Sequence, residues 1–348
     1  MLAVRRTSAR LSLAALSPLL LLALGCKDGD TTRTSTAAAT VAARPADSSK
    51  PASVTNPVAT PPTPAEAPAL EPAAAYREAE ANLKSGHYTE AADGFAAYTR
   101  SRPENPWGFY MLGLASWKAG NDAEALQGFD QALALDPRHL KSLLNSSRVL
   151  LELGRPQEAI DRLQSALAVE SQSGDAYRLL GRAHAQLRDV DSAEAAYRKA
   201  IAIDERDAWA MNNLGLLYLD LGRDGDALPP LARAVALKPK APVFQNNLGQ
   251  ALEHTGYYTA AKTAYEAALA SDSTYGKASV GLQRVTDRAD QPSFGALDLD
   301  ALALSFQSQV QEWRSALGEQ SDSDAQGEVA RDSTPEDSVQ VAEPSSPQ

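Results

Sequence analysis

The stretches MNNLGLLYLDLG (residues 211–222) and QNNLGQALEHTG (residues 245–256) repeat the core Asn-Asn-Leu-Gly at an interval of 34 residues. This interval organises most of the chain, because six rows of 34 residues fit end to end from Pro72 to Tyr275 without an insertion. Five of the rows carry a glycine near their middle, at positions 86, 120, 154, 222 and 256. The period therefore predicts an array of equal structural units.

The recurring small residues have a physical role in a pair of packed helices. A glycine enters the left-handed backbone region at little cost and so ends the first helix of a pair. Arg188 occupies this slot in the fourth row, where a left-handed turn would cost about 1 to 2 kcal/mol. A second set of glycines lets the two helices approach closely. These glycines stand at positions 113, 181, 215 and 249. Pro229 and Pro230 fall inside the second helix of the fifth row and predict a shortened or bent helix there.

The whole pattern resembles the tetratricopeptide repeat, a helix-turn-helix unit, over about three fifths of the chain. The resemblance implies an all-α fold over residues 72–289, namely a right-handed superhelical solenoid of six such units plus a C-terminal capping helix. The stretch GKASVGLQRVTDR, which follows Tyr275, predicts the capping helix, because repeat arrays close their open ends. Alanine and leucine dominate the apolar content, which also favours helices.

The N-terminal residues 1–25 form a predicted signal peptide. An apolar run at residues 11–25 follows three arginines and is short for a membrane span. Cys26, the only cysteine, comes directly after Gly25, an arrangement that resembles a bacterial lipoprotein signal. The resemblance implies cleavage before Cys26, its modification with lipid such as palmitate, and a periplasm-facing anchor in the cell envelope. Lys27 favours the outer membrane by the same resemblance. The alternative is an ordinary secretory signal with a leftover thiol.

Low-complexity segments and one amphipathic helix flank the repeats. Residues 26–71 are rich in Ala, Thr, Ser and Pro, so they predict a disordered tether that cannot bury enough apolar surface to fold. Residues 290–318 predict an amphipathic helix, and residues 319–348 predict an acidic disordered tail. The apolar face of helix 298–317 has three candidate partners: the solenoid or its groove, another protein or a second copy, and a lipid surface.

Asparagines at one slot of the first helix form the main candidate site. By resemblance to the family, this slot lines the concave groove, and Asn145, Asn213 and Asn247 occupy it in three rows. Asparagine disfavours a helix interior, and its amide offers a donor and an acceptor that match an extended peptide backbone. Leu179 and Met111 interrupt the series in two other rows. The alternative is that the amides only cap or bridge neighbouring units.

Other side chains predicted to line the groove are aromatic, basic or amide-bearing. Aromatic rings commonly dominate peptide recognition, and a basic stretch favours a ligand with carboxylates. Each aromatic side chain has packing between repeats as its alternative, and each basic one has scattered surface charge. The candidates are Trp107, Tyr110, Trp117, Trp209, Lys141, Arg148, Arg178, Arg182, Asn212 and Asn246.

Composition and motifs exclude several classes of function. The formal net charge of −11 and the lack of clustered Lys and Arg argue against nucleic acid as a partner. The sequence carries no phosphate loop, dinucleotide fingerprint or nucleophile elbow, so no enzyme, catalytic residue or cofactor is predicted. The four histidines fall in different rows and predict no metal site.

The sequence thus predicts a lipid-anchored envelope scaffold or adaptor that binds peptide segments of partner proteins in its groove. Three alternatives stay open. The first is a structural lipoprotein that self-assembles through its C-terminal amphipathic helix, and the second is a pilotin-like assembly factor. The third is an accessory protein that binds the substrate of an enzyme.

Overall fold

The computed structural model describes residues 72–288 and 297–332. Within these ranges the chain forms fourteen helices and no strand, so the predicted all-α fold is confirmed. The predicted signal peptide, Cys26 and the tether lie outside the described residues, as does the end of the acidic tail. No described helix has the length and apolar character that a membrane span requires.

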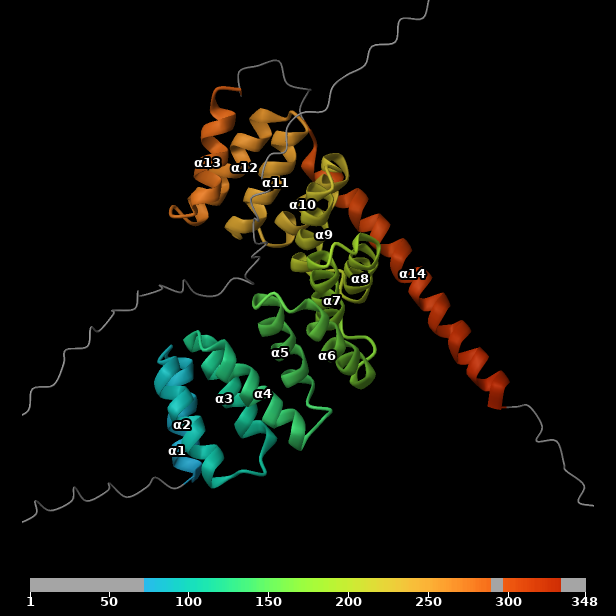
Figure 1. Ribbon diagram of the computed structural model, residues 1–348. Helices are drawn as coiled ribbons and strands as arrows, with labels where there is room; N and C mark the ends of the chain where they lie inside the picture. The colour runs from blue at the N-terminus through green and yellow to red at the C-terminus, as the bar shows by residue number, and fades with distance from the viewer. Residues whose placement is uncertain (1–71, 289–296, 333–348) are drawn as a thin grey trace, which may run out of the picture. The chain divides into compact units, whose positions relative to one another are not determined.

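Helices α1 to α12 form six consecutive pairs, and α13 follows as a single helix (Figure 1). The second helix of each pair contacts the first helix of the next pair, so the packing is that of the predicted repeat array. The odd-numbered helices up to α11 are called first helices here, and their even-numbered partners second helices. The pairs are α1 Pro72–Lys84 with α2 Tyr88–Ser101, α3 Pro106–Ala119 with α4 Asp122–Leu135, α5 Leu140–Glu152 with α6 Pro156–Val169, α7 Gly174–Gln186 with α8 Val190–Ile203, α9 Ala208–Asp220 with α10 Asp224–Leu237, and α11 Pro242–His254 with α12 Tyr258–Ser271; α13 is Gly276–Thr286.

The turn inside each pair uses left-handed backbone, as the sequence predicted. The five mid-row glycines have φ between 68° and 92°. Arg188 has a φ of 62° and is the non-glycine residue with positive φ among the described residues. The neighbouring repeats therefore impose the turn on Arg188 against its own conformational preference.

Replacing Arg188 with glycine is expected to raise the free energy of unfolding by about 1 kcal/mol, because glycine removes the clash between Cβ and the backbone at positive φ. The reciprocal change Gly222→Arg creates the same clash and is expected to lower that free energy by a similar amount. Denaturant midpoints measured by circular dichroism check both changes. If the two denaturant midpoints shifted in the same direction, this explanation of the turn would be contradicted.

The close approach of the two helices in a pair is visible at the second set of recurring glycines. A Cβ built on Gly181 would lie 2.5 Å from the ring of Tyr197, and one built on Gly113 would lie 2.8 Å from the ring of Phe129. The side chains facing these glycines are buried, and their rings fill the space that a Cβ would need. This set of glycines therefore has the packing role that the sequence predicted.

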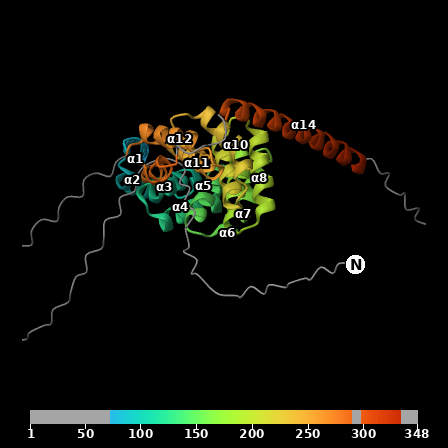
Figure 2. The ribbon, with the colours of Figure 1, turned by 90° about the horizontal axis from the view of Figure 1, so that it is seen from above.

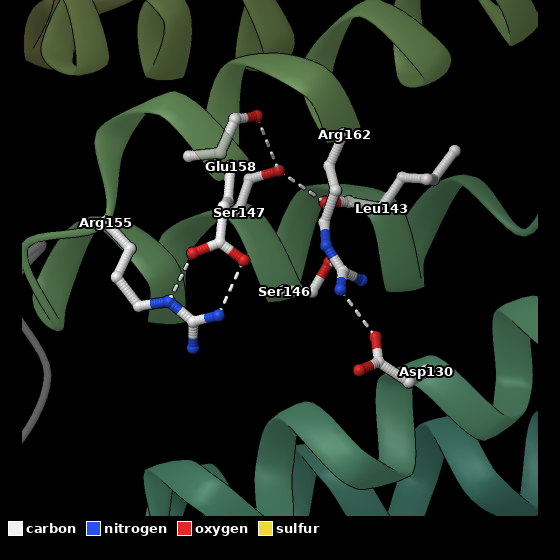
Figure 3. A network of polar contacts seen from close by, with 8 residues as sticks. Asp130, Leu143, Ser146, Ser147, Arg155, Glu158 and Arg162 are labelled. Carbon is white, nitrogen blue, oxygen red and sulfur yellow. Dashed lines mark hydrogen bonds and ion pairs between the residues drawn. The ribbon is translucent and has the colours of Figure 1, made fainter.

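The third repeat replaces this glycine by a serine and joins its neighbours through polar contacts (Figure 3). The Ser147 hydroxyl donates to the Leu143 carbonyl oxygen at 2.7 Å within α5. Arg162 of α6 donates to the Ser146 hydroxyl at 3.2 Å and forms an ion pair with Asp130 of α4 at 2.6 Å. One guanidinium thus connects the second and third repeats.

Helix α10 was predicted to be shortened or bent, and it is not shortened. It keeps fourteen residues, the same length as the other second helices, although Pro229 and Pro230 lie in its interior. The expected shortening is therefore absent. Pro230 and Leu231 are buried, and burial of this face offsets the backbone hydrogen bonds that two prolines remove.

Helix α13 closes the array through an ionic cluster at Glu253, near the end of α11. The Glu253 carboxylate accepts two hydrogen bonds from the Arg284 guanidinium of α13, at 2.8 and 2.7 Å, and one from the Tyr265 hydroxyl of α12 at 2.8 Å. Burial acts to raise the pKa of Glu253, but the hydrogen bonds from Arg284 and Tyr265 outweigh it and lower the pKa. The charged carboxylate therefore ties three helices together.

Changing Glu253 to glutamine is expected to lower the free energy of unfolding by about 1 to 2 kcal/mol at pH 7. Because the folded pKa is depressed, the stabilisation is present above the unfolded value of about 4.3 and is lost as the pH falls through the folded value. The difference between the two proteins should therefore shrink on acidification. Urea unfolding at several pH values checks this, with Glu266→Gln on the exposed side of α12 as control. A difference that is constant with pH would contradict it.

Helix α14, Leu299–Asp332, packs against the second helices α8 and α10 (Figure 2). Ala303, Phe306 and Val310 are buried on one helical face, and Phe306 and Val310 belong to the same apolar cluster as the fourth to sixth repeats. Glu205 accepts hydrogen bonds from Gln311 at 2.6 Å and from Arg314 at 2.8 Å. In this structure the apolar face of the helix thus lies against the second helices.

The helix also continues beyond residue 318, where the sequence analysis placed the start of a disordered tail. Its backbone is helical to Asp332. Extending an existing helix needs no new nucleus, and no proline interrupts residues 318–332. The predicted boundary is therefore wrong for these residues, and the remainder of the tail lies outside the described ranges.

Candidate functional site

The predicted site residues lie on the first helices, which contact one another in succession from α3 to α11. The structure therefore brings these residues onto adjoining elements, although they are far apart in the sequence. They form three local groups, one aromatic, one ionic and one made of amides.

The aromatic group lies at the start of α3 and α5. The Trp107 ring lies 5.0 Å from the Tyr110 ring, and the Lys141 ammonium lies 4.9 Å above the Trp107 ring. His139 also contacts both rings. Trp107 is 38% exposed, whereas Tyr110 is buried. Trp107 is therefore the aromatic candidate with the most surface open to a partner.

The other two aromatic candidates pack between repeats. Trp117 is partly buried and its indole nitrogen donates to the Glu152 carboxylate at 3.0 Å. Trp209 is also partly buried and stacks edge to face on Phe244 of the next repeat, with the ring centroids 4.8 Å apart. Both rings thus have the packing role that the sequence analysis held as the alternative.

Asn145 joins the second and third repeats. Its amide nitrogen donates to the Tyr110 hydroxyl at 3.2 Å, and its amide oxygen accepts from Arg148 at 2.6 Å. Burial raises the pKa of the Tyr110 phenol against these two neighbours, so the hydroxyl keeps its proton at neutral pH. One N–H of the Asn145 amide is left over, because the nitrogen carries two.

The four asparagines of α9 and α11 form a chain of amides. Asn246 donates to Asn247 at 3.1 Å, Asn247 donates to Asn212 at 2.8 Å, and Asn212 donates to Asn213 at 3.4 Å. The middle bond joins the fifth and sixth repeats. Asn213 is the last member of this series of amides, and its amide nitrogen donates to no other residue within the described ranges. The amide oxygen of Asn213 is thus occupied and its nitrogen is not.

The two bridging amides share one geometry. Asn145 and Asn247 each donate to the residue 35 positions earlier, which is the preceding slot of the preceding row. Bridging between units is therefore a real role of these asparagines. All three asparagines of this slot are buried, with 5% to 8% of each residue exposed.

The basic group is partly neutralised by two aspartates. Arg178 is buried and donates to Asp207 at 3.1 Å and to Asp175, and Arg148 lies 3.5 Å from Asp175. Burial acts to raise the pKa of Asp175, but Arg178 and Arg148 outweigh it and lower the pKa. For Asp207 burial prevails and raises the pKa.

These pairings reduce the charge that a ligand would meet. Arg148 and Arg178 are engaged with carboxylates of the protein, whereas Lys141 is exposed and Arg182 has a buried Nε without a hydrogen-bond partner. Sequence reasoning missed Asp175 and Asp207. The spacing of three residues between Asp175 and Arg178 on one predicted helix was the available signal.

The sequence of this array matches a known family. A family model described as tetratricopeptide repeat matches residues 72–139, 144–208 and 212–276, which together exceed half of the chain. The chain belongs to the tetratricopeptide repeat (TPR) family. The resemblance found in the sequence is thus confirmed. A search of curated protein sequences found no match.

Solved structures are similar to this chain, and two of them share its fold with a TM-score above 0.5. A TPR protein from Parabacteroides merdae is 15% identical, with 63% of this chain and 86% of that chain covered and a TM-score of 0.54. The Cut9–Hcn1 hetero-tetramer of the APC/C is 18% identical, covers 62% of this chain and 43% of that chain, and has a TM-score of 0.55. A thermophilic TPR protein from Thermus thermophilus is 22% identical, with coverages of 52% and 98% and a TM-score of 0.47. At these identities the likeness concerns the fold alone.

The described residues show no grouping of three or more His, Cys, Asp or Glu side chains that would suit a metal ion. TPR proteins are typically non-enzymatic scaffolds for protein interactions. The arrangement of amides, exposed tryptophan and lysine on the first helices is suited to binding a partner.

Proposed function

We propose that this TPR protein is a scaffold that binds an extended peptide segment of a partner along its first helices. The observation that carries the proposal is the recurrence of asparagine at one slot of α5, α9 and α11, namely Asn145, Asn213 and Asn247, each of which keeps 5% to 8% of its surface exposed. Each has an N–H that no described residue accepts, and an extended peptide offers carbonyl oxygens to accept it. Membership of the TPR family supports a protein-binding role.

The affinity would come from more than the amides. A net hydrogen bond contributes about 0.5 to 1.5 kcal/mol, so three amides alone give a weak complex. Trp107 supplies an exposed aromatic surface beside Lys141, which suits a ligand that carries both an apolar and an acidic side chain. Helix α14 leaves this surface open, because its contacts are with the second helices α8 and α10.

A photoreactive phenylalanine analogue at the exposed position 141 of the full chain, beside Trp107 and outside the pocket lining described below, tests the proposal in cells. We expect it to crosslink to a partner segment, whereas the same analogue at the exposed position 266 of α12 should not. The crosslinked segment, prepared as a peptide, then allows the amides to be tested singly. Asn213→Ala is expected to weaken its binding about 2- to 12-fold, the factor that corresponds to one hydrogen bond.

Asn213 is the decisive amide, because its nitrogen bridges no repeats within the described ranges, and its loss removes only the 3.4 Å hydrogen bond from Asn212 within α9. Asn82→Ala on α1, outside the series, serves as control and should leave binding unchanged. Equal binding by the Asn213→Ala protein would show that the series only connects repeats.

We also propose that the protein is anchored in the bacterial cell envelope by lipid on Cys26, facing the periplasm. The support is the order of arginines, apolar run, glycine and cysteine at residues 5–26. A Cys26→Ala chain should then leave the membrane fraction and take up no labelled palmitate. Retention of the label would refute the anchor.

A further inference from the structure

A pocket of about 630 Å³ lies at the first repeat and shares Trp107 with the aromatic group described above. It is enclosed by the start of α1, the end of α2, the connection between α2 and α3, and the start of α3. Its walls include Tyr76, Tyr98 and Trp107, and its rim includes Arg77, Arg102 and Glu104. The pocket therefore combines an aromatic lining with two guanidinium groups and one carboxylate, so its charged lining is net positive.

The aromatic walls are held in place by hydrogen bonds. The Trp107 indole nitrogen donates to the Tyr76 hydroxyl at 2.7 Å, and the Tyr76 ring packs edge to face on Tyr98 at 5.1 Å. The Asn105 amide nitrogen donates to the Tyr98 hydroxyl at 2.9 Å, while its oxygen caps the α3 backbone. A ligand would thus meet a wall that is already ordered, which lowers the entropic cost of binding.

The groups left for a ligand are mostly hydrogen-bond donors. Each phenol oxygen accepts a bond from its neighbour, and neither phenol donates its own proton to another described residue. Arg77 and Arg102 are exposed, and within the described ranges neither guanidinium has a hydrogen-bond or ion-pair partner. The pocket therefore suits a ligand with carbonyl acceptors, few N–H groups and negative charge.

The chain itself supplies such a ligand at the rim of the pocket. Pro72 and Ala73 belong to the lining, so the chain enters α1 there. The residues directly before it read PPTPAEAPALE, at positions 61–71. Prolines lack N–H donors and pack well on aromatic rings. Glu66 and Glu71 are the charged residues of this stretch, and they complement the two arginines.

We propose that the pocket between α1, α2 and the start of α3 is a binding site for the proline-rich acidic segment 61–71 of the same chain. Because about five extended residues span roughly 16 Å, the segment is long enough to turn back from Pro72 into the pocket. Direct linkage also gives it a high effective concentration. Docking would set the direction in which the chain before residue 61 leaves the repeats.

A distance measurement on the full chain tests the proposal. Spin labels are placed by Ala65→Cys in the segment and by Ala97→Cys on the exposed side of α2, with Cys26→Ser removing the native thiol. We expect pulsed electron resonance to give a narrow distance distribution. Trp107→Ala should abolish the narrow component, whereas Trp117→Ala, outside the pocket, should preserve it. A broad distribution in the parent protein would overturn the proposal.

Charge reversal keeps the test decisive if Trp107→Ala perturbs folding. Arg77→Glu with Arg102→Glu should also abolish the narrow component, and adding Glu66→Arg with Glu71→Arg should restore it. Failure of the restoration, with circular dichroism unchanged, would overturn the proposal. A mixture of singly labelled chains distinguishes docking within one chain from exchange between two. A short distance in that mixture would show that the segment docks on a second copy and would contradict the proposal.

Discussion

A leucine at position 181 is expected to lower the free energy of unfolding by about 3 kcal/mol or more, which is the upper end of the usual cost of overpacking. Even the Cβ of the new side chain would lie 2.5 Å from the Tyr197 ring, between α7 and α8. Tyr197 is buried, so its ring has no free space into which to move. The two helices would have to separate, and the loss would spread to the contacts of the fourth repeat with its neighbours.

Gly225→Leu provides the matched control. Gly225 lies in the first turn of α10 and is exposed, and a Cβ built there would meet no atom within 4 Å. Leucine favours helix over glycine by somewhat less than about 1 kcal/mol, so this variant should be slightly stabilised. Urea unfolding of both variants, followed by circular dichroism, gives the comparison. Similar losses at both positions would show that close helix approach is not what the glycine at 181 provides.

The fold was predictable because each constraint occurs several times in the sequence. One glycine before a turn is weak evidence, but the same slot carries glycine in five rows and a positive φ in all six, Arg188 included. A residue type that recurs at one slot thus indicates a requirement of the repeat unit, whereas a residue found in a single row does not. The full length of α10 was not predictable in this way, because Pro229 and Pro230 occur in one row only. The backbone hydrogen bonds that they remove are offset by packing that is not visible in the sequence.

The site was predictable only in part. The period placed Asn145 and Asn247 on the first helices, but it did not reveal that they donate to Tyr110 and Asn212 of the preceding repeats. Such pairings depend on side-chain rotamers and on the separation of neighbouring helices. Charge compensation was missed for the same reason, since Asp207, which caps the start of α9, reaches Arg178 of α7.

The repeats contained an indication of the surface that binds α14, which the sequence analysis did not use. Ala232 of α10 is buried, and the same slot carries Arg198 in the fourth row and Glu266 in the sixth. An alanine where neighbouring units are charged leaves room for another element on the outer side of α10. Arg198 borders this α14-binding surface, with its guanidinium 5.2 Å from the Trp313 ring.

Phe306→Ala is expected to detach α14 from the repeats. Truncating a buried phenylalanine usually costs about 3 to 5 kcal/mol. Here the loss falls on one helix that joins the array through a single face, with Ala303 and Val310 as the other buried residues. The helix can leave while the repeats stay folded, so the cost should appear as local opening rather than as lower global stability. Hydrogen exchange should therefore quicken along residues 299–317.

Leu304→Ala is the matched control for this change, because Leu304 lies on the same helix and is 62% exposed. It removes a similar apolar group but does not alter the buried face of α14, so the free energy of unfolding should change by no more than about 0.5 kcal/mol. Because a detached α14 exposes the apolar outer side of α10, the Phe306→Ala protein should also self-associate at high concentration in sedimentation, and the Leu304→Ala protein should not. If exchange quickened equally in both variants, helical propensity rather than docking would hold α14 together, and the contacts of Phe306 would contribute little.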